Sequence, residues 1–292
     1  LGNVDNTSDA NKPVSTATQA AISAILDSKG QPNGIATLDA NKQLVQDAKT
    51  LNGHGTDNGP NSVLLSGRKE GTTIGTNSTA EGLSTTASGY SSHAEGYGTT
   101  ASGESSHAEG DHAQASREYS HAEGSNTTAS DSCSHAEGSN TKAIDSCSHA
   151  EGSNTEASGY SSHAEGYGTT AIGGYSHAEG DSTTASSYSS HAEGQATTAS
   201  VLCSHAEGRS TTASGESSHA EGYGTTANTY CSHAQGQYNK TLAGDPSVYS
   251  TDADVMVIGN GSPGALSNCF RITFDGNVYG LSSYHSSGAD YS

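Results

Sequence analysis

The chain has 292 residues, a formal net charge of −20, no Trp, two Phe and only 11 Lys and Arg. Cationic side chains are so few that nucleic acid and anionic membranes are poor partners, and no run of about eighteen apolar residues could span a bilayer. An ordinary globular core is excluded because large apolar residues are scarce. We therefore expect backbone ladders and small side chains to provide the order, in a thin rod that needs partner chains.

Residues 1–28 are predicted to form a polar arm followed by a short helix. The helix has an apolar stripe that includes Ile22 and Ile25, and Ser15 or Thr16 can serve as its N-cap. The stripe is too short to hold a helix alone, so a bundle is expected. Residues 29–70 contain two short apolar stretches between polar turns, which predicts an irregular β neck.

Histidine recurs every fourteen residues from His93 to His233, within Ser-His-Ala-Glu-Gly words whose last copy reads Ser-His-Ala-Gln-Gly. A fixed short period predicts a solenoid in which each repeat is one coil. We expect residues 71–236 to form this β-roll. In the coil of residues 92–105, a Ser-His-Ala-Glu strand closed by glycine alternates with a second strand over residues 99–102.

The alternation of side chains along each strand predicts which positions face inward. The positions of Ala94 and Ala101 hold Ala in every coil, and that of Thr99 holds Thr in nearly every coil. These three are expected inside, where only small residues fit. The positions of Thr100 and Ser102 accept charged and bulky residues elsewhere, so the outer face of the second strand is predicted to be solvated.

The His and Glu positions point outward from the first strand, yet they hardly vary along the chain. A solvated face would vary as the second strand does. We therefore expect this face to pack against the same face of sister chains around a rotation axis, with His and Glu hydrogen-bonded across it. The predicted axial ladder consists of His93, Glu95, His107, Glu109, His121, Glu123, His135, Glu137, His149, Glu151, His163, Glu165, His177, Glu179, His191, Glu193, His205, Glu207, His219, Glu221, His233 and Gln235.

Histidine beside glutamate also suggests catalysis or metal binding. Catalysis needs one constellation, whereas eleven copies indicate a repeat, so no catalytic residue is predicted. Axial histidines from three chains could hold Zn, Ni or Fe. Because a Glu beside every His but the last already offers a hydrogen-bond partner, we favour the hydrogen-bonded ladder and expect no cofactor.

The turns between strands carry tyrosines and cysteines. Tyr97, Tyr167 and Tyr223 are candidate receptor contacts, since exposed tyrosines can stack on sugar rings, and packing between coils is the alternative. Four of the five cysteines share the position two residues before the histidine. Cys133 and Cys147 lie on adjacent coils, about 4.8 Å apart, so a disulfide between them stays open.

The period breaks after Gly236. Residues 237–265 are predicted to form a connection and a last, apolar coil. Residues 266–292 are predicted to form a C-terminal hairpin cap, with an Asp-Gly turn after Phe274, and a cleavage boundary.

The coil resembles the fourteen-residue head repeat of trimeric autotransporter adhesins over roughly residues 71–265. That family implies an all-β fold, a left-handed parallel β-roll with three chains side by side. Its usual repeats have Val and Ile where this chain has His and Glu, and only residues 255–259 (VMVIG) match the apolar form. The resemblance therefore predicts a homotrimer whose axial residues differ from those of the family.

The ends of the chain are similar to tailed-phage fibres. The similarity lies within residues 1–16, 34–39 and 51–55. Residues 268–280 and 287–292 look like the entry to an autoproteolytic intramolecular-chaperone domain, which implies that a longer precursor cuts itself at or near Ser292. The cleaving residues of that family are not present in this sequence.

Together these features predict a phage tail fibre or appendage, a non-enzymatic shaft for host attachment on the virion. Its expected partners are two sister chains, tail or baseplate proteins through the N-terminus, and a host cell-surface receptor such as a glycan, without nucleic acid or membrane insertion. The head of a bacterial trimeric surface adhesin is the alternative. An envelope polysaccharide depolymerase is the third hypothesis, although no acidic pair or nucleophile stands out from the repeats.

Overall fold

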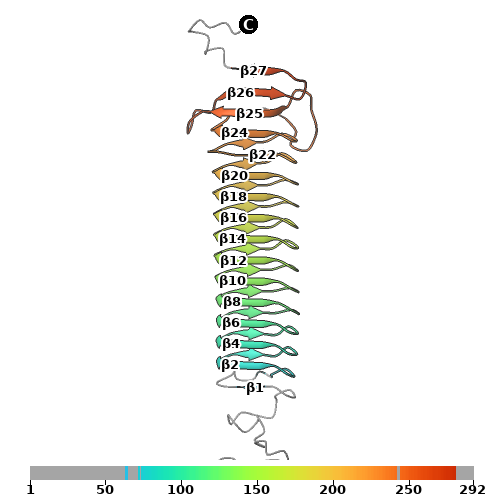
Figure 1. Cartoon of the computed structure of the whole chain (residues 1–292), viewed down its shortest axis with the longest axis vertical. Coiled ribbons are helices and arrows are strands. Elements are labelled where there is room, and N and C mark those ends of the chain that lie inside the picture. Colours follow the sequence, from blue (N-terminus) through green and yellow to red (C-terminus); the bar gives the residue numbers. More distant parts are fainter. Residues whose placement is uncertain (1–62, 65–71, 73, 242–243, 281–292) are drawn as a thin grey trace, which may run out of the picture. The chain divides into compact units, whose positions relative to one another are not determined.

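A computed structural model describes residues 63–64, 72, 74–241 and 244–280, and within them the repeats form a parallel β-solenoid with 14-residue coils (Figure 1). The chain divides into two units, residues 1–58 and 59–292, and all described residues belong to the second. The predicted arm, helix and most of the neck lie outside the described residues. The described part contains no helix, and hence none with the length and apolarity needed to cross a membrane.

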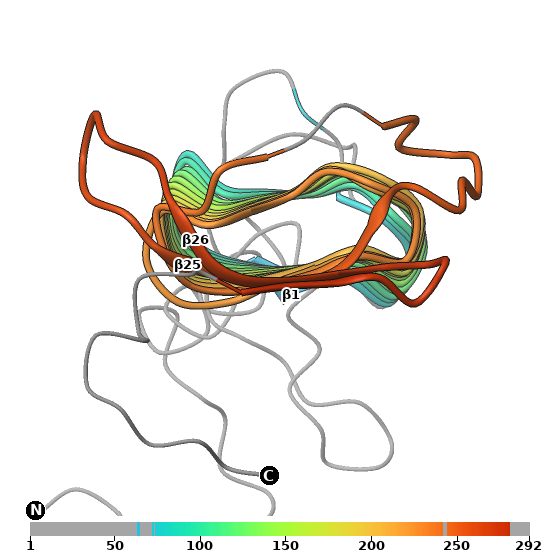
Figure 2. The same ribbon diagram turned by 90° about the horizontal axis from the view of Figure 1, so that it is seen from above.

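Each coil contributes one strand to each of two sheets, which face each other across the flattened ring seen in Figure 2. In spatial order, the strands of the first sheet are β1 (Val63–Leu64), β2 (Thr79–Leu83), β4 (His93–Tyr97), β6 (His107–Asp111), β8 (His121–Ser125), β10 (His135–Ser139), β12 (His149–Ser153), β14 (His163–Tyr167), β16 (His177–Asp181), β18 (His191–Gln195), β20 (His205–Arg209), β22 (His219–Ala220), β24 (His233–Gln237), β25 (Asp254–Asn260), β26 (Asn268–Thr273) and β27 (Val278–Gly280). Those of the second sheet are β3 (Thr86–Ala87), β5 (Thr100–Ala101), β7 (Gln114–Ala115), β9 (Thr128–Ala129), β11 (Lys142–Ala143), β13 (Glu156–Ala157), β15 (Thr170–Ala171), β17 (Thr184–Ala185), β19 (Thr198–Ala199), β21 (Thr212–Ala213) and β23 (Thr226–Ala227).

The predicted 14-residue coil is confirmed, because neighbouring strands pair with a register shift of one repeat, such as His93 opposite His107. The strand limits differ from the prediction. The first strand continues through Gly96 to Tyr97 instead of closing at the glycine. Gly96 has a φ of 111°, a conformation open to glycine, and it pairs with Gly110 in the ladder. The second strand is shorter than predicted and spans Thr100–Ala101.

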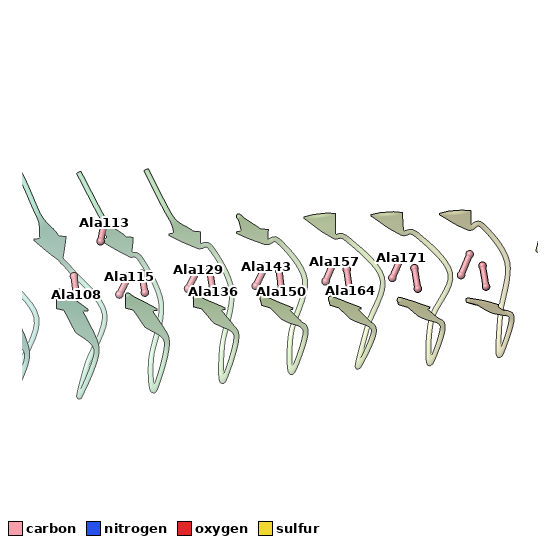
Figure 3. Close-up of a cluster of buried hydrophobic side chains, with 14 of the residues drawn as sticks. Ala108, Ala113, Ala115, Ala129, Ala136, Ala143, Ala150, Ala157, Ala164 and Ala171 are labelled. Atoms are coloured by element: carbon pink, nitrogen blue, oxygen red, sulfur yellow. The ribbon is translucent and has the colours of Figure 1, made fainter. Parts of the chain in front are cut away.

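The core consists of small side chains, as the alternation predicts. The Ala94 and Ala101 positions are fully buried or nearly so in every coil, and Thr99 is also buried. Figure 3 shows these alanines pointing into the space between the two strands of each coil. Ser92, which lies before the strand, is buried too, and its hydroxyl donates a hydrogen bond of 2.9 Å to the Gly89 carbonyl. Only small residues fit between sheets this close together.

The corners hold left-handed residues that the sequence analysis did not identify. The position of Cys133 has a φ of 51–59° in all eleven coils from Ser91 to Cys231, whichever residue occupies it. The Cys133 amide donates to the Glu118 carbonyl of the preceding coil at 3.0 Å. The corner is therefore defined by backbone hydrogen bonds between coils, which leaves its side chain free to vary. Cys133 and Cys147 are exposed free thiols.

The regular stack ends at β25. This strand pairs in parallel with β24 and places Met256 opposite His233 and Ile258 opposite Gln235. β26 then pairs antiparallel with β25, and β27 pairs antiparallel with β26. The Arg271 Nε atom lies 2.7 Å from Asp254 Oδ1, which ties β26 to the start of β25.

Candidate functional site

The outer face of the first sheet carries a column of histidines beside a column of glutamates. We call this surface, formed by the residues of the predicted ladder from His93 to Gln235, the His–Glu face. Strand register aligns each His with the His of the next coil and each Glu with the next Glu until Glu207. Neighbouring imidazole rings stack with centroids 4.6–4.9 Å apart and planes inclined by 1–18°. The structure therefore places all the predicted ladder histidines in one continuous stack.

Each histidine of this face has a ring nitrogen without a hydrogen-bond partner. Their side chains are 34–41% exposed where an ion pair is formed, yet the Nε2 atom of all eleven is buried and has no hydrogen-bond partner. A buried nitrogen without a partner costs free energy. The chain alone therefore leaves one unsatisfied group in each coil of the stack.

Carboxylates approach these nitrogens without bonding to them. From His93 to His163, wherever an ion pair is formed, Nε2 lies 3.6–3.8 Å from the carboxylate of the same coil. From His191 to His233, the nearer carboxylate belongs to the preceding coil, at 4.0 Å falling to 3.4 Å. The change occurs at Glu179, which has one oxygen 4.0 Å from His177 and the other 4.0 Å from His191.

Burial disfavours the charged form of six of the eleven imidazoles. Desolvation, and then the charge of neighbouring histidines, lowers the pKa of several of them below the ordinary value of 6.5. These are His107, His121, His135, His163, His191 and His205. Neutral imidazoles cannot balance the neighbouring carboxylates at pH 7.

Neighbouring carboxyl groups of the glutamate column affect one another's pKa between Glu165 and Glu207. Hydrogen bonds with Glu207 and then Glu179, followed by desolvation, raise the pKa of Glu193 to about 7. The hydrogen bond with Glu193, followed by that with Glu165, lowers the pKa of Glu179. The pKa is alternately raised and lowered from Glu165 to Glu207, so these four carboxyls do not ionise independently.

A groove of about 1140 Å³ runs beside the glutamate column. It is lined by glutamates from Glu151 to Glu221 and by the glycines that follow them, with Ile258 at one end. These glycines are explained within the chain. A Cβ on Gly166, for example, would lie 2.1 Å from the Gly180 carbonyl oxygen, and its φ is +109°.

Some side chains of the face could serve as metal ligands. Four sets bring three ligand atoms within 4.8 Å of one another. They are His149, Glu151 and His163; His163, Glu165 and His177; His205, Glu207 and His219; and Glu179, His191 and Glu193.

The predicted receptor tyrosines lie along one corner of the solenoid without contacting one another. Tyr97, Tyr167 and Tyr223 are exposed by 49%, 59% and 38% at the same corner. They are five and four coils apart, about 24 and 19 Å at about 4.8 Å per coil. Ser292, the predicted cleavage boundary, lies outside the described residues.

Sequence analysis missed an aromatic cluster at the other corner. The ring centroids of Tyr160 and Tyr175 are 5.4 Å apart, and those of Tyr175 and Tyr188 are 5.2 Å apart. All three side chains are about half exposed. Tyr175 occupies a different repeat position from the other two, so the cluster follows from geometry rather than from the period.

No family model and no curated protein matches the chain. Its function must therefore be argued from the chemistry of its own surface.

Proposed function

We propose that this chain is the shaft of a homotrimeric fibre of the tailed-phage type, which serves in host attachment. In this assembly, three copies pack their His–Glu faces around a common axis. Carboxylates of a sister chain then accept hydrogen bonds from the imidazoles, and the sister chain covers the groove beside the glutamate column.

The observation that carries the proposal is the set of eleven buried Nε2 atoms without partners. Hydroxyls without partners also occur at the Thr99 position, but they are enclosed inside the coil, and three other uniform positions have reasons within the chain. Ala94 fills the narrow interior, Ser106 bonds the Gly103 carbonyl at 2.7 Å, and Gly96 has no room for a side chain. The uniform His and Glu positions lack such a reason. Stacked like charges are unfavourable in one chain, which supports stabilising contacts from outside it.

The number of copies and the phage assignment rest on the resemblance rather than on this geometry. The head repeats that the coil resembles are trimeric, and the phage-like segments lie within residues 1–55. Genes for tail and baseplate proteins beside this one would support the phage fibre. A downstream outer-membrane anchor would favour the bacterial adhesin instead, and release of sugars from a host envelope would favour the depolymerase.

The mass of the full chain in solution tests the assembly. Light scattering should give three times the chain mass, and a mass of one or two chains would contradict the proposal. Replacing His149 and His163 together by Ala should lower the temperature at which the trimer dissociates.

The matched control for this variant is Lys142→Thr on the second-strand face. Lys142 is 57% exposed and pairs with Glu156 at 3.7 Å, and surface pairs of this kind contribute little. This control should dissociate as the parent does. If the control and the double His variant changed the dissociation temperature equally, the proposal that the His–Glu face forms the interface would be contradicted.

A further inference from the structure

The change of carboxylate partners at Glu179 creates a local arrangement that the other coils lack. His191 lies between the glutamates of two coils, Glu179 of the preceding coil and Glu193 of its own. One ligand atom from each of these three side chains lies within 4.8 Å of the other two. Of the four sets of candidate ligands, this is the one with a single imidazole and two carboxylates.

Ring stacking disfavours the other three sets. Each contains two histidines from neighbouring coils, with ring planes inclined by only 1–5° and centroids 4.6–4.8 Å apart. The lone pair of an imidazole nitrogen lies in the plane of its ring. Two stacked parallel planes share no point, so one ion cannot lie on both lone pairs. A single imidazole with two carboxylates avoids this conflict.

We propose that Glu179, His191 and Glu193 of one chain bind a divalent first-row transition metal ion such as Zn²⁺ or Mn²⁺. Zinc binds imidazole nitrogen and carboxylate oxygen at about 2.0–2.2 Å in a tetrahedral arrangement, which sets its ligand atoms about 3.4 Å apart. The side chains therefore need to close by at most about 1.4 Å, because their ligand atoms lie within 4.8 Å of one another. Three protein ligands leave further positions for water.

The local chemistry favours a cation over an uncharged occupant. The His191 Nε2 atom is buried and has no hydrogen-bond partner, so its lone pair or its proton is unsatisfied. Glu179 and Glu193 are neighbours in a column of stacked carboxylates, where a divalent ion offsets their repulsion. This metal site uses residues of one chain and does not depend on the trimer proposed above.

Metal binding by the full chain tests the proposal. Protein stripped with EDTA is dialysed against Zn²⁺ and the bound metal is measured by mass spectrometry, with Co²⁺ absorption as a second probe of the coordination. The parent should retain one ion per chain. His191→Gln and Glu193→Gln, which approximate the native shapes, should each weaken Zn²⁺ binding at least about tenfold.

His135→Gln is the matched control. His135 belongs to the same stack, but no carboxylate oxygen lies within 4.0 Å of its Nε2 among the described residues, and it belongs to none of the four sets. This variant should bind Zn²⁺ as the parent does. A parent that binds no ion, or equal losses in His135→Gln and His191→Gln, would overturn the proposal.

Two further measurements separate this site from the assembly and from misfolding. Zn²⁺ should raise the thermal midpoint of the parent but not that of His191→Gln. The metal-free parent, His191→Gln and Glu193→Gln should have the same circular dichroism spectrum. If both variants had an altered spectrum, which would indicate misfolding, Zn²⁺ binding would be measured with Glu179→Gln instead. Light scattering with and without EDTA reports the assembly independently.

Discussion

Substitution of two nearby glycines, Gly166 and Gly168, should have very different effects on the free energy of unfolding. Gly166 lies in β14 with a φ of +109°, and a Cβ there would be 2.1 Å from the Gly180 carbonyl oxygen. The left-handed backbone costs a side chain about 1–3 kcal/mol. The contact is more than about 1 Å too short and its partner is backbone held in the ladder, which adds about 1–3 kcal/mol. Gly166→Ala should therefore cost about 2–6 kcal/mol per chain.

Gly168→Asn is the matched control, two residues along the same corner. Gly168 has a φ of +62°, and a Cβ added there would have Ser182 Oγ as its nearest neighbour, at 3.7 Å. The equivalent positions hold Asn126 and Asn140 at φ 54° and 55°, and Asn tolerates this region. The change should stay within about 0.5 kcal/mol of the parent. Urea unfolding followed by circular dichroism measures both variants. A Gly166→Ala midpoint equal to that of the parent would refute the reasoning.

Two further predictions concern buried polar groups. The Thr155 hydroxyl is buried without a hydrogen-bond partner, so Thr155→Val should not lower the urea midpoint, whereas Thr225→Val removes a 2.9 Å bond to the Glu221 carbonyl and should cost about 1 kcal/mol. Burial lowers the pKa of His121 in the folded chain, so its neutral form contributes stability above pH 6.5 that is lost as the pH falls toward the folded pKa. The free energy of unfolding of the parent, relative to that of His121→Asn, should therefore be lower at pH 5 than at pH 7.5. An unchanged difference would contradict the burial of this ring.

The coil and its interior could be predicted because they depend on period and side-chain size. A repeat that places Ala94 and Ala101 on the inner faces of two short strands has few other solutions, since larger residues would separate the sheets. The left-handed corner could not be predicted in the same way. Ser91, Tyr119 and Cys133 share it, and no common property of their side chains indicates a positive φ. Backbone bonds between coils impose that conformation.

The change of partners at Glu179 was beyond sequence reasoning for another reason. The coils on either side carry the same Ser-His-Ala-Glu-Gly words, yet His163 contacts the carboxylate of its own coil and His205 that of the coil before. Identical repeats cannot indicate where such a change occurs. The metal site proposed at His191 therefore follows from the three-dimensional arrangement alone.

The glutamate column of the His–Glu face places like charges next to one another within a single chain. In-register glutamates about 4.8 Å apart repel one another, and neutral imidazoles cannot neutralise them. The raised pKa of Glu193 and the lowered pKa of Glu179 relieve part of this repulsion, because a protonated Glu193 carries no charge. The glutamate column is unfavourable in one chain and is nevertheless repeated coil after coil, which agrees with the proposal that other groups contact it. Sister chains would supply such contacts along the face, and a bound cation would supply one at His191.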